Sequence, residues 1–304
     1  MMWVVLILLG IVAVPLTIEW TRKGISEKDR SRATGQFALL SQGTTHFEWL
    51  GPERGPVALC IHGLTTPSFV WRGMAKGLAL MGFRVLVYDL YGRGLSERVR
   101  GKQDAAFFVQ QITDLLAHEN VKGHLTVFGY SMGGAIAAHF TAQHPGSVKQ
   151  LVLLAPAGMF DLGGGKLRTA RDVPLIGDWL FLLIYPFMLR QGIRAEAHLP
   201  SSVPDIAALQ AAETDRRGFF PAVLASVRGI LRDTTEEQQR AVAAAGVPVL
   251  AIWAEEDGVI PVSGKDMLAQ WIPQAMQVVV PEATHSITYT HTDQVLEVFR
   301  TSRG

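Results

Sequence analysis

The chain has 304 residues, 28 Lys and Arg against 27 Asp and Glu, a formal net charge of +1 and 48% hydrophobic residues. This composition excludes an intrinsically disordered chain and supplies enough apolar material for one large α/β domain. The nearly balanced charge gives no electrostatic footprint for nucleic acid, so we expect no nucleic-acid partner. The single cysteine, Cys60, excludes an internal disulfide and a cysteine-rich zinc site, and we expect neither a metal nor a cofactor.

The chain opens on an uninterrupted apolar run over residues 1–18, before the first charge at Glu19. An α-helix of that length measures about 27 Å, close to the thickness of a hydrocarbon core. Trp3 and Trp20 lie near its two ends, where interfacial aromatic residues are favoured. Because nothing basic precedes the run and no A-x-A site follows it, residues 1–20 are predicted to be a transmembrane anchor and not a cleaved signal peptide.

Residues 21–36 are predicted to be a juxtamembrane linker rich in basic residues. Its cations are Arg22, Lys23, Lys28, Arg30 and Arg32. Cations that follow a first membrane span favour a cytoplasmic position for the rest of the chain. A single-span protein can also translocate a large folded domain, so a periplasmic position stays open as the alternative. The predicted localisation is a membrane, which in a bacterium would be the inner, or cell, membrane.

Continuously apolar strands alternate with helices through most of the remaining chain, after two short strands around Gly43. Strands are expected at 56–61, 84–89, 125–130, 150–156, 247–254 and 277–281, and helices at 71–82, 107–119, 132–144, 264–272 and 291–301. This alternation predicts an α/β fold built on a mostly parallel, doubly wound sheet that is covered on both faces. We assign residues 37–158 and 246–304 to this core. The rhythm breaks over 159–245, which is predicted to be an insertion.

Gly129-Tyr130-Ser131-Met132-Gly133 matches the pattern G-x-S-x-G. A strand-like segment precedes the pattern and a helix of small residues follows it, which is the context of a sharp strand-to-helix turn. Such a turn holds its central residue in strained backbone geometry, and the flanking glycines remove Cβ atoms that would collide there. Ser131 is therefore the predicted nucleophile, exposed at the carboxyl edge of the sheet above a helix N-terminus.

With two further motifs, the serine motif resembles the α/β-hydrolase superfamily over about residues 37–301. Ile61-His62-Gly63-Leu64 follows the first parallel strand, as the oxyanion loop of that family does, and the segment DLYGRGLS from Asp89 to Ser96 is similar to its D-x-x-G-x-G-x-S turn. The resemblance implies a serine hydrolase with a helical cap inserted at 159–245. The family members with an aspartate nucleophile are excluded because Ser131 holds that position.

A serine nucleophile needs a base, and the base needs an acid that fixes its tautomer. In the α/β-hydrolase fold these residues occur in the order Ser, Asp or Glu, His. His285 follows a predicted strand and precedes the last helix, which is the position of the base. We interpret His62, on the oxyanion loop, as structural. His139 and His144 lie on or after the helix that follows the serine, and His291 opens the last helix.

Three consecutive carboxylates follow a late strand, namely Glu255, Glu256 and Asp257. Similarity to the family's E-x-D-x-x-x-P loop implies that Asp257 is the acid. Glu255 is the alternative, although a solvated loop position suits it better. Asp89, in the glycine-rich turn, and Asp114, on an amphipathic helix, are interpreted as structural residues.

The resemblance also implies an oxyanion hole made of two backbone N–H groups. One belongs to Met132, the residue after the nucleophile, and the other to Leu64, which follows His62-Gly63. The sequence contains no HGGG run, so the hole would be of the kind that uses a single glycine.

The apolar stretches 173–176 and 179–189 are too short to span a bilayer, so they pack on the core, line a pocket or dip into an interface. An apolar cap combined with a membrane anchor is similar to membrane-anchored monoacylglycerol lipases, lysophospholipases and a bacterial phospholipase A. This resemblance implies a membrane-tethered serine ester hydrolase that cleaves acyl esters through an acyl-enzyme. A lipid such as a monoacylglycerol or a (lyso)phospholipid would be its substrate, and the bilayer its partner.

Three other functions stay open. The protein could be a small-ester carboxylesterase without a lipid role, or it could run another reaction on the same residues, such as C–C bond hydrolysis, thioester cleavage, peptide hydrolysis or acyl transfer. The third alternative is a receptor or scaffold that only binds a ligand. The complete set Ser131, Asp257 and His285 argues against that last function. A homodimer is compatible with the sequence.

Overall fold

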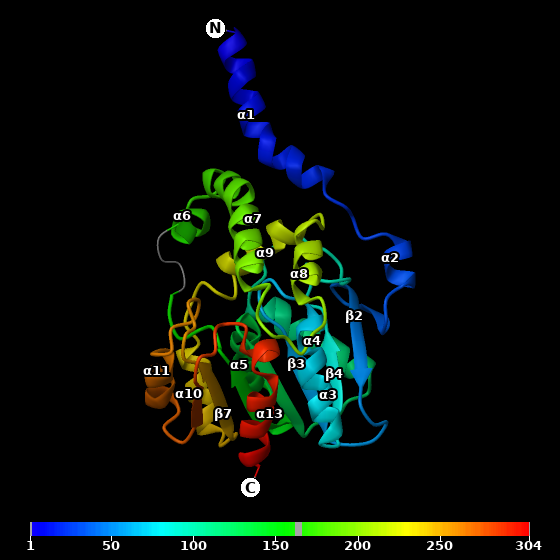
Figure 1. Cartoon of the computed structure of the whole chain (residues 1–304), viewed down its shortest axis with the longest axis vertical. Helices are drawn as coiled ribbons and strands as arrows, with labels where there is room; N and C mark the ends of the chain where they lie inside the picture. Colours follow the sequence, from blue (N-terminus) through cyan, green and yellow to red (C-terminus); the bar gives the residue numbers. More distant parts are fainter. Residues whose placement is uncertain (1, 162–165, 304) are drawn as a thin grey trace.

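The structure, a computed structural model, describes residues 2–161 and 166–303, except for the side chains of residues 4–9 and 166–167. The first residue of the predicted anchor and four residues of the predicted cap lie outside the described residues. The described chain forms a sheet flanked by helices, further helices above one end of that sheet, and one long helix that projects beyond them (Figure 1).

Eight strands form one sheet in the order β1-β2-β4-β3-β5-β6-β7-β8. The strands are β1 (Gln36–Leu40), β2 (Gly43–Leu50), β3 (Val57–Ile61), β4 (Arg84–Tyr88), β5 (Leu125–Tyr130), β6 (Val148–Leu154), β7 (Val249–Ala254) and β8 (Met276–Val280). The pairs β1–β2 and β2–β4 are antiparallel, and the pairs from β4 to β8 across the sheet are parallel. The mostly parallel α/β sheet predicted from the sequence is confirmed, and the two short strands around Gly43 form its antiparallel edge.

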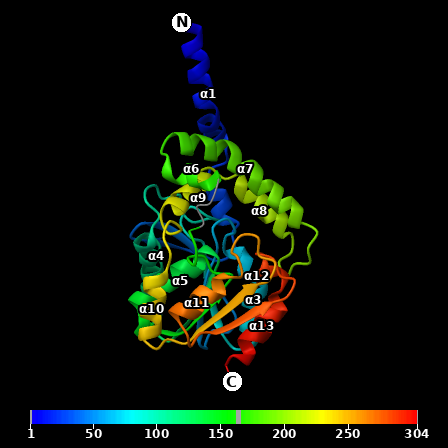
Figure 2. The same ribbon diagram turned by 90° about the vertical axis from the view of Figure 1, so that its left-hand side faces the viewer.

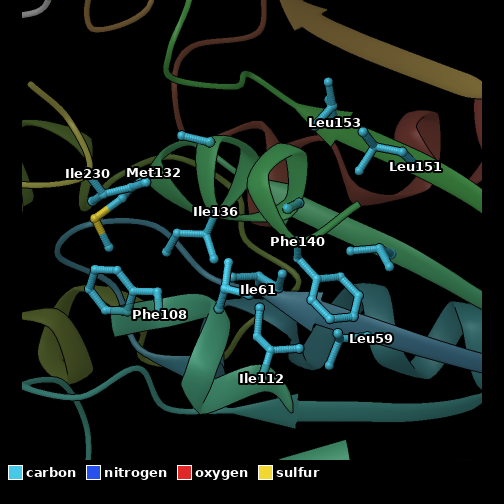
Figure 3. Packing of buried hydrophobic residues seen from close by; sticks show 14 of the residues in the cluster. Leu59, Ile61, Phe108, Ile112, Met132, Ile136, Phe140, Leu151, Leu153 and Ile230 are labelled. Atoms are coloured by element: carbon cyan, nitrogen blue, oxygen red, sulfur yellow. The ribbon is translucent and has the colours of Figure 1, made fainter. Parts of the chain in front are cut away.

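Helices cover both faces of this sheet. One face carries α4 (Ala105–His118), α5 (Met132–Gln143), α10 (Glu236–Ala244) and α11 (Gly264–Trp271). The other face carries α3 (Arg72–Leu80), α12 (Ile287–Thr290) and α13 (Thr292–Thr301). Three short helices lie in connections, namely α2 (Glu27–Ser31), η1 (Ser68–Trp71) and η2 (Pro145–Ser147). In β3, Leu59 and Ile61 belong to the cluster with α4 and α5 (Figure 3), whereas Ala58 and Cys60 belong to the cluster with α3 and α13. Burial on both faces explains why the strands are apolar at every position.

Four helices between β6 and α10 lie above the sheet in Figure 1, and we call them the cap helices. They are α6 (Lys166–Asp172), α7 (Ile176–Glu196), α8 (Ile206–Thr214) and α9 (Phe219–Arg228). The helix α10 also falls within the insertion predicted at 159–245, but it packs against α5 and α11, and its Val242 belongs to the core cluster. The described insertion is therefore shorter than predicted, because α10 is part of the layer that covers the sheet.

The helix α1, Met2–Thr21, projects away from the rest of the molecule in both ribbon views (Figure 2). It lies beside α7, where Trp179 Nε1 donates a hydrogen bond of 3.1 Å to the Ile11 carbonyl. The transmembrane anchor predicted over residues 1–20 is not confirmed, since among the residues that the structure describes no helix is long and apolar enough to cross a membrane.

After α1 the chain binds to the loop between α8 and α9 before it reaches the sheet. Lys23 N donates to Asp215 O at 3.0 Å, and Arg217 N donates back to Lys23 O at 2.8 Å. Glu19 Oε1 accepts a hydrogen bond of 2.6 Å from Gly218 N. We call this set of bonds the linker–cap contact. The basic linker is thus attached to the cap helices, which the sequence did not indicate.

Glu213, on α8, is a buried carboxylate between the cap helices and the core. Its Oε2 accepts a hydrogen bond of 3.0 Å from Gly94 N and lies 3.6 Å from Arg98 Nη2. Burial raises the pKa of Glu213 to about 7, in spite of the nearby Arg98. The folded protein therefore holds a proton on this carboxyl more tightly than the unfolded chain does.

The substitution Glu213→Gln should change stability in a pH-dependent way. Because the pKa rises on folding from 4.5 to about 7, wild-type stability falls as the pH rises between these values. The variant lacks this loss, so we expect little difference at about pH 5 and a gain of about 1–3 kcal/mol at about pH 8. Thermal unfolding at the two pH values measures it. The exposed Glu237→Gln is the matched control, and an equal effect of Glu213→Gln at both pH values would contradict the prediction.

Candidate active site

Ser131 lies in the tight turn between β5 and α5, with φ of 54° and ψ of −121°. A positive φ is unfavourable for a residue with a side chain, so the neighbours must hold this turn. An added Cβ at Gly133 would lie 2.1 Å from the Ile61 carbonyl oxygen, and one at Gly129 would lie 2.5 Å from Gly133 O. Close backbone packing, as the sequence predicts, is what requires both glycines.

Backbone hydrogen bonds fix the turn from two sides. Ser131 N donates to Leu154 O, at the end of β6, with a distance of 3.0 Å. Ser131 O accepts from Ala157 N at 2.9 Å and from Gly134 N at 2.8 Å. The serine is therefore held at the carboxyl end of β5 and at the N-terminus of α5, where helical N–H groups favour negative charge.

The three residues predicted as nucleophile, base and acid lie within hydrogen-bonding distance of one another. His285 Nε2 is 2.9 Å from Ser131 Oγ, and His285 Nδ1 is 2.8 Å from Asp257 Oδ2. They come from the ends of β5, β8 and β7, which are parallel strands whose carboxyl ends meet at one edge of the sheet.

The two carboxylates weighed as the acid have different surroundings. The Asp257 side chain is only 1% exposed, and its Oδ1 accepts hydrogen bonds of 2.7 Å from both Val259 N and Ile260 N. Glu255 is exposed, and its Oε2 accepts from Glu282 N at 3.1 Å. Asp257 is therefore the carboxylate that is fixed by backbone N–H groups and hydrogen-bonded to His285, whereas Glu255 stabilises the neighbouring loop at Glu282.

Tyr130, next to Ser131 in the chain, supports His285 through a contact that sequence reasoning missed. Its hydroxyl donates a hydrogen bond of 2.9 Å to the His285 carbonyl. Burial raises the pKa of Tyr130 well above its ordinary value, so the hydroxyl stays a proton donor. Its position inside the serine motif was visible in the sequence, but the partner 155 residues away was not.

The predicted oxyanion loop after β3 lies against Ser131, because an added Cβ at Gly63 would be 3.2 Å from Ser131 Cβ. His62 Nδ1 is hydrogen-bonded to Gly63 O at 2.8 Å, and its Nε2 accepts from Leu90 N at 2.9 Å. These partners require the tautomer with the proton on Nδ1. Burial lowers the pKa of His62 to about 4, so the ring stays neutral at ordinary pH. His62 is structural, in keeping with the sequence interpretation.

The other candidates take no part in the hydrogen bonds of the three residues. His139 lines a surface cavity beside α10, His144 lies against a phenylalanine ring of α5, and His291 is bonded to the preceding threonine. Asp114 accepts a hydrogen bond of 2.6 Å from Gln110 on α4. Within residues 2–161 and 166–303, no three His, Cys, Asp or Glu side chains group so as to hold a metal ion.

Asp89 organises the glycine-rich turn after β4. It accepts hydrogen bonds of 2.9 Å from Ser68 N and Leu95 N, and lies 2.8 Å from His46 Nδ1. Burial opposes its ionisation, but these bonds and the charge of His46 hold the pKa of Asp89 below its usual range. The added Cβ at Gly94 would lie 2.0 Å from Asp89 Oδ2, which explains the glycine. The structural role predicted for Asp89 agrees with these contacts.

Arg93, in the same turn, is fully buried and was not singled out from the sequence. Its Nε donates to Leu64 O at 3.0 Å, and its Nη2 donates to Ser226 Oγ at 2.9 Å. Its Nη1 donates to Gln103 Oε1 at 2.7 Å. Burial lowers the pKa of Arg93 to about 9, so the group is still charged at neutral pH. Arg93 therefore ties the oxyanion loop to the cap helix α9.

The cap helices contribute an apolar cluster that reaches the oxyanion loop. Its buried members are Ala170, Phe181, Leu182, Phe219, Phe220, Val223 and Leu224. Leu64 and Tyr185 pack against this cluster. A chemical group bound between the oxyanion loop and the cap helices would therefore meet a largely apolar wall.

The close packing of the serine turn leads to a prediction about stability. Gly133→Ala should lower the free energy of unfolding by about 3 kcal/mol, since the new Cβ must displace the Ile61 backbone and not a flexible side chain. Gly146→Ala is the matched control, because its Cβ would meet nothing within 4 Å. Urea unfolding of both variants measures the difference, and equal stabilities would refute the packing argument.

Comparison with known proteins identifies the family. The profile of the alpha/beta hydrolase fold family matches residues 56–292. Lipase 1 of Psychrobacter immobilis is 25% identical over 300 residues, which cover 95% of this chain and 90% of that protein. The pimeloyl-[acyl-carrier protein] methyl ester esterase of Aliivibrio salmonicida is 25% identical over 258 residues, covering 83% and 94%. The crystal structure of the enol-lactonase from Burkholderia xenovorans superposes with a TM-score of 0.70 at 18% identity, covering 88% and 98%. The chain thus belongs to the alpha/beta hydrolase fold family.

Proposed function

We propose that the protein is a serine ester hydrolase that works through an acyl-enzyme. The observation that carries this proposal is the hydrogen-bonded series from Ser131 Oγ through His285 to Asp257 Oδ2, with distances of 2.9 and 2.8 Å. This geometry suits proton transfer from a serine hydroxyl. The names of two relatives, a lipase and a methyl ester esterase, support the same class of reaction here.

In the first half of the proposed reaction, neutral His285 accepts the Ser131 proton at Nε2 while Oγ attacks the ester carbonyl carbon. Asp257 accepts a hydrogen bond from His285 Nδ1–H and stabilises the imidazolium that forms. The tetrahedral intermediate collapses as the C–O bond breaks, and His285 gives its proton to the leaving alkoxide. In the second half, His285 accepts a proton from the water molecule that attacks the acyl-enzyme carbonyl. It then donates this proton to Ser131 Oγ as the C–O bond to the serine breaks and the carboxylic acid leaves.

The proposed oxyanion hole consists of the N–H groups of Met132 and Leu64. Met132 is the first residue of α5, where N–H groups have no partner within the helix. The Leu64 N–H belongs to the peptide unit of the Gly63 carbonyl, which His62 Nδ1 binds at 2.8 Å. Since N–H and C=O point in opposite directions in a trans peptide, this bond helps to orient the donor.

We propose an acyl ester of lipid type as the substrate. The support is the apolar cluster of the cap helices, which includes Phe181, Phe219 and Leu224 and contacts Leu64 of the oxyanion loop. An alkyl chain placed there would be removed from water, which is favourable in proportion to the apolar area buried. A monoacylglycerol or a (lyso)phospholipid would present such a chain next to its ester bond.

We further propose that α1 attaches the enzyme to a membrane, with the catalytic part on the cytoplasmic side. Val12 and Leu16 on this helix are 55% and 57% exposed, and Trp20 is 71% exposed. Burying such a surface in lipid would remove it from water. The basic residues that follow α1 favour anionic head groups and the cytoplasmic side.

The substitutions Ser131→Ala and Asp257→Asn should each strongly lower the rate of ester hydrolysis. We expect a loss of about 10³-fold or more for Ser131→Ala, because no other group can form the acyl-enzyme. Hydrolysis of a nitrophenyl ester series of increasing acyl length measures the loss. In the wild type, a fluorophosphonate should label Ser131 and longer acyl chains should react faster.

Glu255→Gln is the matched control for Asp257→Asn, and it should keep its activity within about threefold, because among the described residues the Glu255 carboxylate is hydrogen-bonded only to a loop N–H. Circular dichroism confirms folding of each variant. One tenth of the wild-type activity in Ser131→Ala, or equal losses in the two carboxylate variants, would overturn these assignments.

Deletion of residues 1–18 tests the proposed attachment and keeps Glu19 and the linker–cap contact. The wild type should stay in the membrane fraction through a carbonate wash, and the deletion variant should not. Hydrolysis of a short soluble ester should change by less than about twofold, whereas hydrolysis of monoacylglycerol in phosphatidylcholine vesicles should slow about tenfold, since tethering raises the local concentration. Equal losses on both substrates would mean that α1 supports the fold and is not a tether.

A further inference from the structure

A cavity of about 750 Å³ lies where the end of α1, the linker, the loop at 97–103 and the cap helix α9 meet. We call it the junction cavity. It is lined neither by Ser131 nor by Asp257 or His285, so it is separate from the candidate active site. One part of its wall is apolar and comes from Leu16, Trp20, Ile25, Leu182, Pro221 and Ala222.

The charged part of the wall carries more cations than anions. Four arginines and two glutamates line it, namely Arg30, Arg98, Arg100, Arg217, Glu19 and Glu97. Both carboxylates already have partners, since Glu19 Oε1 accepts from Gly218 N at 2.6 Å and Glu97 Oε2 accepts from Thr44 N at 2.8 Å. An anion that enters the cavity would therefore meet an excess of positive charge.

Three of the lining residues carry buried donors without hydrogen-bond acceptors among the described residues. They are Arg98 at Nε and Nη2, Arg30 at Nε and Gln103 at Nε2. The nearest ion pair of Arg98 Nη2, with Glu213, is long at 3.6 Å. Gln103 is only 1% exposed, so the unpaired N–H group of its amide is a costly buried donor. Buried donors are nearly always paired in folded proteins, so this group of unpaired donors indicates that an acceptor binds beside them.

We propose that the junction cavity binds an anionic amphiphile, with a carboxylate or phosphate head group on Arg30, Arg98 and Gln103 and its alkyl chain against Leu16 and Leu182. Guanidinium N–H groups form charge-assisted hydrogen bonds with both kinds of head group. A free inorganic anion has no apolar part to bury, so it would leave the apolar wall of the cavity without a partner. A released fatty acid and an anionic membrane lipid share this chemistry.

This proposal depends neither on ester hydrolysis nor on membrane attachment by α1. It follows only from the donors and the wall of the cavity. A bound amphiphile would contact α1, the linker and α9 at once, so it would strengthen the linker–cap contact.

Photolabelling of the full chain, solubilised in a neutral detergent, tests the proposal. The probe is dodecanoate with a diazirine at the end of the chain, and dodecanol with the same group is the neutral control. The label is located by mass, so a chain near Ser131 is distinguished from one in the junction cavity. We expect the acid, but not the alcohol, to label the tryptic peptide 218–228 of α9.

Arg30→Gln and Arg32→Gln form a matched pair on the linker, since only Arg30 lines the cavity and Arg32 is exposed. Loss of a charge-assisted hydrogen bond should lower labelling about tenfold in Arg30→Gln, and Arg32→Gln should label within about twofold of the wild type. Arg98→Gln is a second test, and circular dichroism melting shows whether each variant is folded.

Competition separates the sources of the ligand. Displacement of the probe by unlabelled dodecanoate alone indicates a fatty acid, and displacement by dodecyl phosphate indicates a phosphate head group; either result supports the proposal. Equal displacement by inorganic phosphate, equal labelling by the alcohol, or equal losses in Arg30→Gln and Arg32→Gln would overturn it.

Discussion

The positive φ of Ser131 is the constraint on which the arrangement of the site depends. A residue with a side chain held in this region costs about 1–3 kcal/mol, so the surrounding backbone must compensate. The compensation comes from the hydrogen bonds of Ser131 with Leu154 and Ala157, which join the turn to β6 and the loop after it. The glycines around the turn let β3 and α5 approach so closely that no side chain could be inserted.

This close approach also determines what surrounds the serine. The loop at Gly63 lies against Ser131 Cβ, so its orientation has to be fixed by groups behind it. His62 and Arg93 are those groups, and both are buried. The Arg93 guanidinium donates only to uncharged oxygens in the hydrogen bonds described for it, which holds the loop and α9 together without a buried ion pair. Losing one partner would leave a buried charge unsatisfied, which is costly.

The features that could be predicted from the sequence are those with a local or periodic signal. Continuously apolar strands predicted the parallel sheet, because a strand buried on both faces needs an apolar residue at every position. The motif around Ser131 and the chain order of acid and base predicted which three side chains come together. The choice of Asp257 over Glu255 came from a resemblance, and the loop amides that hold Asp257 give it a structural reason.

The features that could not be predicted depend on partners far away in the chain. Tyr130 and Arg93 reach acceptors 155 and 133 residues away, and no pattern near either residue announces the contact. The helix α10 was placed in the insertion because the alternation of strands and helices breaks over 159–245, and only Gln239 and Val242 are buried in this helix. The linker cations were interpreted as charges beside a membrane, and no pattern indicated that the backbone of Lys23 also forms hydrogen bonds with the loop after α8.

The linker–cap contact joins α1 and the cap helices into one connected unit. Asp29 is still paired with Arg216 of the α8–α9 loop at 3.1 Å, whereas Thr34 O is already bonded to His46 of β2 at 2.7 Å. The few residues between Asp29 and Thr34 therefore connect that unit to the sheet. If the cap helices rotate over the candidate active site, α1 turns with them. Because a helix of its length extends about 30 Å, a rotation of about 10° would carry its far end through about 5 Å. A membrane that holds this far end in place would resist the rotation, and so would set how freely the cap can move.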